Sequence, residues 1–180
     1  MIGRSGKAAA VIQSVIAVGA IGTGYLYSGV YPVGADVPHT RPVLWLLQTL
    51  RERSIERASR DIVVPPLDDP KLLLSGGADY NDMCAGCHLK PGRQDSDLSI
   101  GLYPRPPDLA ARVEVPDGRQ DDDMQTARRR FWVIKHGIKA SGMPAWGRTH
   151  DDQRIWAMVA FLRRLPDLTP LQYQILTTKI

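Results

Sequence analysis

The sequence is poor in cysteine and histidine, the residue types that most often bind soft metal ions. Its 180 residues include two cysteines and four histidines. The two cysteines stand three positions apart, a spacing at which they rarely form a structural disulfide with each other. A structural zinc site takes four nitrogen or sulfur ligands, and beyond Cys84, Cys87 and His88 only three scattered histidines could complete one. A structural zinc site at Cys84, Cys87 and His88 is therefore not favoured.

Aromatic residues and excess charge are also scarce. Aromatic residues make up 7% of the chain, and they do not alternate with basic residues as a surface for stacking bases would require. The formal charge is +4, and two of these charges, Arg4 and Lys7, precede a long apolar segment. The remaining 21 basic and 19 acidic residues nearly cancel. We therefore expect no nucleic-acid partner.

The segment from Ala8 to Ala35 lacks any charged residue and is mostly apolar. About 20 apolar residues are enough to span a bilayer. Because Arg4 and Lys7 precede this segment, the positive-inside rule predicts a cytoplasmic N-terminus and a periplasmic remainder, with the chain in the inner membrane. Val33-Gly34-Ala35 offers small residues for signal-peptide cleavage, but the apolar run is long for a signal peptide. We expect a retained single-pass anchor over residues 1–35.

A small-residue face occurs within this segment. Ala20, Gly24 and Ser28 follow one another at four-residue spacing, which permits close approach of another helix in lipid. A partner membrane subunit and a merely glycine-rich span explain this pattern equally well.

Residues 36–71 are predicted to connect the anchor to a folded domain. Three prolines between Tyr31 and Pro42 favour an extended exit from the membrane. Apolar residues at helical spacing between Val43 and Ile62, with arginines interspersed, then predict an amphipathic helix. Such a helix can pack on the chain's own folded domain, on a partner or on anionic lipid, and we rank the two protein surfaces above lipid.

Both cysteines belong to one motif, Cys84-Ala85-Gly86-Cys87-His88. A redox Cys-x-x-Cys does not need the following histidine, whereas covalent haem attachment needs all three residues. Two sulfurs three residues apart on a helical turn can reach two vinyl groups at one porphyrin edge, and the histidine can then face the iron. The motif predicts one haem, attached through Cys84 and Cys87 and ligated by His88.

Two further stretches strengthen a family resemblance. Gly142-Met143-Pro144-Ala145-Trp146 and the proline-containing stretch from Gly101 to Leu109 make the chain resemble the class I cytochrome c family over about residues 72 to 166. This resemblance implies an all-α domain around one covalent haem c, in which the last helix crosses the helix that carries Gly76 to Tyr80. It also implies that Met143 is the sixth iron ligand.

The choice of Met143 also has a local reason. It lies in a loop bounded by glycine and proline, where its thioether is free to point inward, whereas the other candidate methionines have helical neighbours. His136 and His150 flank this loop and are the alternative sixth ligands.

The stretch from Gly101 to Leu109 resembles the loop on the proximal haem side in the same family. An axial imidazole needs its second nitrogen held, and a proline carbonyl can accept that bond because proline has no competing N–H. Pro106 or Pro107 is therefore expected beside His88. Arg105 is a candidate for a haem propionate, since a guanidinium can bind a carboxylate through two parallel bonds.

Histidine and methionine ligation would leave the iron without an open position, which favours one-electron transfer over enzyme chemistry. We expect an electron carrier of a respiratory chain whose partners are a terminal oxidase, a quinol-oxidising complex or a periplasmic dehydrogenase. The alternatives are a haem enzyme or gas sensor with a labile Met143, and a mainly structural haem subunit. The predicted order is an anchor over 1–35, a connecting region over 36–71, a haem domain over 72–166 and a tail over 167–180.

Overall fold

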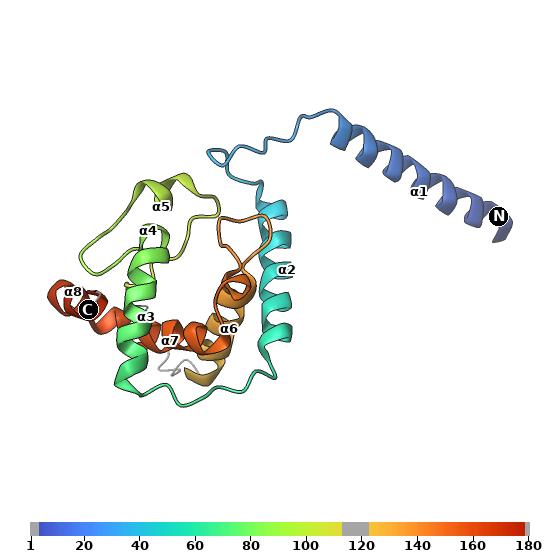
Figure 1. Cartoon of the computed structure of the whole chain (residues 1–180). Helices are drawn as coiled ribbons and strands as arrows, with labels where there is room; N and C mark the ends of the chain where they lie inside the picture. Colours follow the sequence, from blue (N-terminus) through green and yellow to red (C-terminus); the bar gives the residue numbers. More distant parts are fainter. Residues whose placement is uncertain (1–3, 113–122, 179–180) are drawn as a thin grey trace. The chain divides into compact units, whose positions relative to one another are not determined.

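A computed structural model of the chain describes residues 4–112 and 123–178 (Figure 1). Every regular element in those ranges is helical, which confirms the all-α prediction. The α-helices are α1 (Arg4–Tyr27), α2 (Arg41–Ser59), α3 (Pro70–Met83), α4 (Ala85–His88), α5 (Asp97–Gly101), α6 (Asp123–His136), α7 (Asp152–Arg164) and α8 (Pro170–Thr177). Two short 3₁₀ turns, Trp146–Arg148 and Leu165–Asp167, stand on either side of α7.

The chain divides into two compact units, residues 1–37 and 38–180. The first unit contains α1, in which the span Gly6–Tyr27 includes an 18-residue window with a mean hydropathy of 1.6. By length and composition this helix is able to cross a membrane. The second unit contains α2 to α8 and holds the hydrophobic core.

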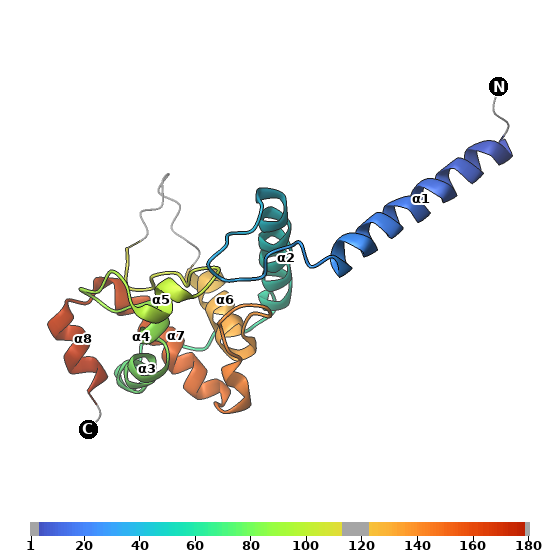
Figure 2. The ribbon, with the colours of Figure 1, turned by 90° about the horizontal axis from the view of Figure 1, so that it is seen from above.

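The core of the second unit is built where α3 crosses α7 (Figures 1 and 2). Asp151 caps the start of α7 by accepting a hydrogen bond from the backbone N–H of Arg154. Eight consecutive residues of α7, from Ile155 to Leu162, are buried. At Gly76 a Cβ atom would overlap the backbone carbonyl of Ala157, so the crossing brings the two backbones into direct contact. This is the helix crossing that the family resemblance implied.

Helix α6 covers another side of α7, and α2 lies against α6. Phe131 of α6 stacks on Trp156 of α7 with ring centroids 4.1 Å apart, and Ile134 is also buried. The inner side of α2 contributes buried Ile55. The amphipathic connecting helix therefore packs on the chain's own folded unit. This was one of the three surfaces that the sequence analysis considered.

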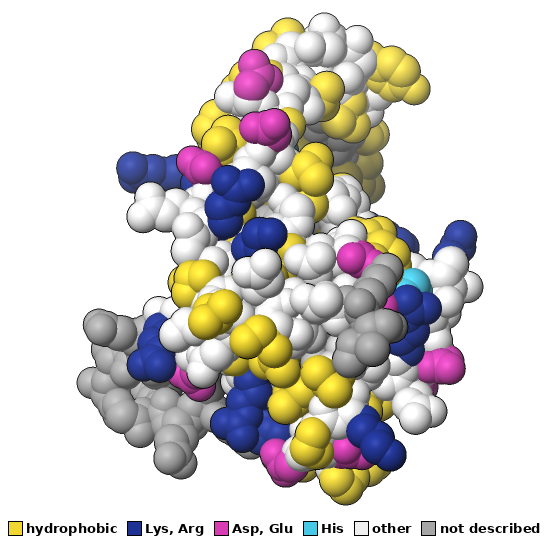
Figure 3. All heavy atoms as spheres, turned by 60° about the vertical axis from the view of Figure 1, so that its left-hand side comes forward, with side chains coloured by type: hydrophobic (Ala, Val, Ile, Leu, Met, Phe, Trp, Pro, Cys, Tyr) yellow, Lys and Arg dark blue, Asp and Glu magenta, His cyan; other side chains and the backbone are white. Residues whose placement is uncertain are grey.

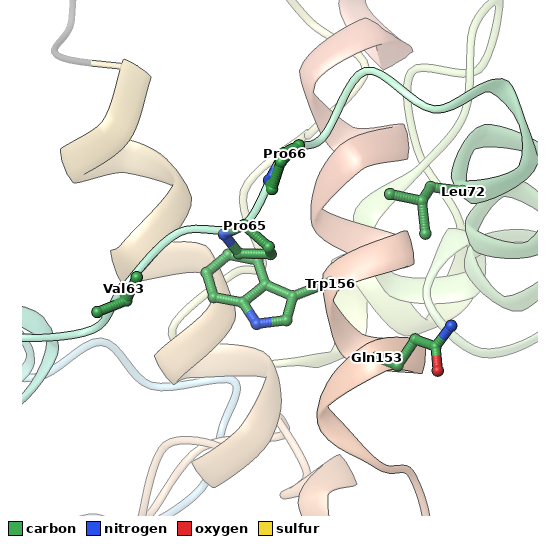
Figure 4. A pocket seen from close by; sticks show the side chains of 6 residues that line it. All are labelled: Val63, Pro65, Pro66, Leu72, Gln153 and Trp156. Atoms are coloured by element: carbon green, nitrogen blue, oxygen red, sulfur yellow. The ribbon is translucent and has the colours of Figure 1, made fainter.

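A small apolar hollow lies where the segment after α2 passes over α7. It is lined by Val63, Pro65, Pro66, Leu72, Gln153 and Trp156, and Figure 4 shows Pro65 close above the Trp156 ring. None of the predicted haem-site residues lines this hollow. It therefore plays no part in the candidate site described below.

Part of the expected tail, residues 170–177, forms helix α8. Helix α8 begins with a capping box between Thr169 and Gln172, and it packs against α3. Its Tyr173 is buried and donates a hydrogen bond to the Asn81 side chain at 3.1 Å. The compact haem-domain unit consequently extends past the predicted boundary at 166 to include α8.

The contact between α3 and α7 yields a stability prediction. Gly76→Ala should lower the free energy of unfolding by about 3 kcal/mol, because the added methyl group meets a backbone that cannot rotate away. Gly101→Ala is the matched control, since nothing lies within 4 Å of a Cβ at that position. It should change stability by less than about 1 kcal/mol. Guanidinium unfolding followed by circular dichroism measures both values, and equal midpoints for the two variants would contradict the prediction.

Candidate haem site

The end of α3 places both cysteines and the histidine on one helical turn. The N–H groups of Cys87 and His88 both donate to the carbonyl of Cys84, at 3.0 and 2.8 Å. Both thiols are free and partly buried. Because this turn fixes the spacing of the three side chains, the two sulfurs and the imidazole belong to one rigid local unit.

The stretch from Leu102 to Leu109 holds His88 at two points. The ring Nδ1 lies 2.9 Å from the carbonyl oxygen of Pro107, and the His88 carbonyl accepts the N–H of Leu109 at 3.1 Å. A carbonyl only accepts, so the hydrogen bond requires the proton on Nδ1 and leaves the lone pair on Nε2. This is the tautomer in which Nε2 is able to ligate a metal.

Tyr80 supports the same turn from inside the core, a role that the sequence reading did not assign. Its side chain is fully buried, and its hydroxyl donates to the carbonyls of Leu89 at 2.7 Å and of His88 at 3.2 Å. Leu89 has a positive φ of 65°, which turns its carbonyl back toward α3. The available signal was the position of Tyr80, one turn before Cys84.

Burial sets the ionisation of the site. It lowers the pKa of His88, an effect that the hydrogen bond to Pro107 partly opposes. It raises the pKa of Cys84 to about 12, with the charges of Asp79 and Cys87 acting in the same direction. Reactive redox cysteines have lowered pKa values, so the Cys84 thiol does not match that class. A neutral imidazole and a protonated thiol are the forms favoured at neutral pH.

The loop after α6 carries Met143 and is closed by its own hydrogen bonds. Gly137 ends α6 at a φ of 65°, and the N–H of Ile138 donates to the Met143 carbonyl at 3.1 Å. Ser141 bridges the loop: its hydroxyl donates to the Ile138 carbonyl at 2.8 Å and accepts the Met143 N–H at 3.1 Å. The sequence reading missed Ser141, although a hydroxyl residue two positions before Met143 is a recognisable turn signal.

The two loops meet each other and the same core. A Cβ on Gly142 would collide with the Leu102 side chain, which places the methionine loop directly against the start of the proline loop. Cys84, Leu109 and Met143 are all partly buried and pack on one hydrophobic cluster. The proline loop therefore contacts both His88 and the methionine loop, and all three segments contribute residues that pack on the same core.

The remaining predicted residues lie less centrally. Arg105 is exposed and donates to the backbone carbonyl of Gln94 at 3.3 Å. Pro106 is half-buried, and the carbonyl that contacts the His88 ring belongs to its neighbour, Pro107. The proposed propionate role of Arg105 therefore stays a prediction.

The alternative histidine ligands have other neighbours. The His136 ring lies 5.0 Å from the ring of Trp132, and the His150 ring lies 5.4 Å from that of Trp146. His150 Nδ1 also lies 2.8 Å from the Thr149 hydroxyl. These contacts place both rings against aromatic side chains that flank the methionine loop.

The side chains that could bind a metal at this site match the haem that the cysteine motif implies. Two thiols, one imidazole with Nε2 available and one thioether are the donors that a haem c with histidine and methionine ligation uses. Within residues 4–112 and 123–178, no group of three or more His, Cys, Asp or Glu side chains is arranged to hold a metal ion. The residues present fit a haem c better than a zinc ion.

The buried hydroxyl of Tyr80 generates the second prediction. Tyr80→Phe leaves two carbonyls at the motif without this donor and should lower the free energy of unfolding by about 1–2 kcal/mol. Tyr173→Phe is the matched control, because the partner of its hydroxyl is the part-buried Asn81 side chain, which water can reach. It should cost less than about 1 kcal/mol. Thermal unfolding of both variants tests this order, and a larger loss for Tyr173→Phe would refute it.

One of three comparisons with known proteins found a match. The model of the family described as cytochrome C oxidase, cbb3-type, subunit III matches residues 72–162, just over half of the chain. Searches of curated proteins and of solved structures gave no match. The matched range contains the cysteine motif, the proline loop and the methionine loop. The chain therefore belongs to this family and carries a c-type cytochrome domain, the domain of a haem-containing electron carrier.

Proposed function

We propose that this chain is a membrane-tethered monohaem cytochrome that passes single electrons between respiratory-chain partners on the periplasmic side of the inner membrane. The observation that carries the proposal is that the proline loop contacts both His88 and the methionine loop, while Cys84 and Met143 pack on the same hydrophobic cluster. The apolar helix α1 supplies the proposed tether, and Arg4 and Lys7 set its orientation. The proposed organisation keeps residues 1–35 as anchor and 36–71 as connector.

Each site residue has a separate task in this proposal. Cys84 and Cys87 form the two thioether links, and His88 ligates the iron through Nε2. Pro107 holds the opposite ring nitrogen, which fixes the ring orientation and raises the basicity of the ligand. A haem c held in this way supplies a one-electron redox centre.

Met143 is the proposed second axial ligand. Its soft thioether favours ferrous over ferric iron and therefore raises the reduction potential. The hydrogen bonds of Ile138 and Ser141 fix the backbone on both sides of Met143. A ligand on a loop anchored in this way is held in place in both oxidation states, which suits a carrier that must change little on electron transfer.

The partners follow from the family and from the proposed location. The family description names an oxidase, and we propose a terminal oxidase as one redox partner, with a quinol-oxidising complex or a periplasmic dehydrogenase as the opposite one. The chain is proposed to act as a subunit or as a docked partner of a membrane complex, and to perform no substrate chemistry itself.

An optical spectrum tests the ligation. The oxidised full-length protein should show the methionine-to-iron charge-transfer band, and the reduced protein should bind carbon monoxide slowly because both axial positions are filled. Met143→Ala should abolish the band and open the iron to carbon monoxide. Met124→Ala is the control, since that half-exposed methionine lies on α6 and should leave the band in place. Rapid carbon monoxide binding by the unaltered protein would instead indicate a sensor or enzyme.

A second test concerns the covalent links. Acidified organic solvent should leave the haem on the unaltered chain and on both single variants, Cys84→Ser and Cys87→Ser, because one thioether remains in each. The double variant should lose all of its haem in the same extraction. Haem that is extracted from the unaltered chain would reject covalent attachment, whatever the axial ligands are.

A further inference from the structure

Helix α2 has a second face that its packing on the folded unit does not use. Its inner side carries buried Ile55 and Ser59 and the ion pair between Glu52 and Arg129 of α6. Its outer side exposes large apolar side chains near the start of the helix. Their exposed fractions are 67% for Trp45, 59% for Leu46, 45% for Leu47 and 66% for Leu50.

The outer side changes character along the helix. Leu46, Leu50, Arg53 and Arg57 follow one another at spacings of four, three and four residues, so they form one stripe along α2. All four are exposed. No charged residue occurs between Arg41 and Arg51, whereas the second half carries three arginines. The stripe is thus apolar first and basic afterwards.

We infer that this outer stripe of α2 docks on the anionic surface of the lipid bilayer, and the inference rests on the proposed anchoring by α1. The apolar half inserts Leu46 and Leu50 below the headgroups, while Arg53 and Arg57 contact lipid phosphates. Trp45 lies beside the stripe, and tryptophan is an amphipathic side chain that favours the depth of the headgroups.

The length of the connection supports lipid as the occupant. Thirteen residues separate the end of α1 at Tyr27 from the start of α2 at Arg41, and fully extended they span at most about 47 Å. The apolar half of α2 is the half nearest the tether in sequence. A membrane surface is therefore always within reach of the exposed leucines.

Charge complementarity supports the same occupant. Helix α2 contains four arginines and two glutamates. Glu52 is engaged on the inner side by Arg51 and Arg129, which leaves the basic side chains of the stripe opposed by Glu56 alone within the helix. A cationic, amphipathic helix with leucines and a tryptophan on its free side has the composition of helices that lie in the bilayer interface.

Trp45 provides the test. The full-length haem protein is reconstituted into vesicles of phosphatidylcholine, alone or mixed with phosphatidylglycerol, in which part of the lipid carries brominated chains. The emission of Trp45 is obtained by subtracting the tryptophan fluorescence of the Trp45→Phe variant from that of the unaltered protein. Bromine should quench this difference signal strongly in the mixed vesicles and less in phosphatidylcholine alone.

Two variants sharpen the result. Arg53→Gln with Arg57→Gln should weaken quenching in the mixed vesicles, since each arginine favours the docked state by on the order of five-fold. The matched control is Leu171→Trp in the Trp45→Phe background. Leu171 lies on α8 and is also 67% exposed. Helix α8 stands on the opposite side of the second unit from α2 in both ribbon views (Figures 1 and 2). Hydrophobic and charged side chains are mixed on the face that carries α8 (Figure 3), so this reporter should remain unquenched.

The outcomes separate the inference from the proposed function. Flotation of the protein with the vesicles tests the anchor independently of quenching. If the protein floats with the vesicles but Trp45 is not quenched, the lipid-docking inference is overturned and the anchor is retained. The α2 stripe would then be assigned to a contact with a partner subunit. Equal quenching of the reporters on α2 and α8 also overturns lipid docking. Failure to float overturns both the anchor and the docking, whereas the haem spectrum reports on the redox site in every case.

Discussion

The close crossing of α3 and α7 is the contact on which the rest of the second unit depends. Gly76 allows the two backbones to touch, and this contact directs Tyr80, one turn later, into the core. Tyr80 in turn reaches the carbonyls of the cysteine motif, so the position of the motif follows from the depth of the crossing. A wider separation of the helices would part the Tyr80 ring from Phe161 of α7, whose ring centroid lies 5.5 Å away. The crossing of α3 and α7 therefore helps to position the haem site through Tyr80.

Loops, rather than helices, complete the site, and backbone hydrogen bonds give them their definition. Pro107 and Leu109 hold the ring and the carbonyl of His88, while Ser141 and Ile138 hold the backbone of Met143. The contact between Leu102 and Gly142 joins the two loops. Because the bonds involve main-chain groups, the geometry depends on loop path and turn type more than on particular side chains. This suits an electron carrier, whose ligands must hold one arrangement in both oxidation states.

The features predicted correctly from the sequence are those that short local patterns of residues define. The Cys84–His88 motif and the methionine loop are short patterns with a direct chemical meaning, and apolar spacing was enough to predict α2. The choice between Pro106 and Pro107 was beyond such patterns, because it depends on the path of a loop without periodicity. The contact of Arg105 with the Gln94 backbone likewise arises only when two loops fold together.

Helix α8 was missed for a different reason. Its eight residues bury one large side chain, Tyr173, which is too weak a periodic signal to predict a helix. Thr169, Pro170 and Gln172 nevertheless form a capping sequence with proline at the first helical position, and this pattern could have marked the start of α8. Similarly, Asp69 before Pro70 is a recognisable capping pattern, and it marks the start of α3.

The packing of α2 connects the proposed membrane contact with the redox site. A tether of thirteen residues by itself restricts distance and leaves orientation free. Within the second unit, however, Ile55 and Ser59 join α2 to the folded unit, and α6 leads through Gly137 directly into the methionine loop. Docking of α2 on lipid would therefore fix the direction in which Met143 faces, as well as its distance from the membrane. Since electron transfer between proteins depends on which edges meet, such a constraint would select partners that present their redox centre close to the bilayer surface.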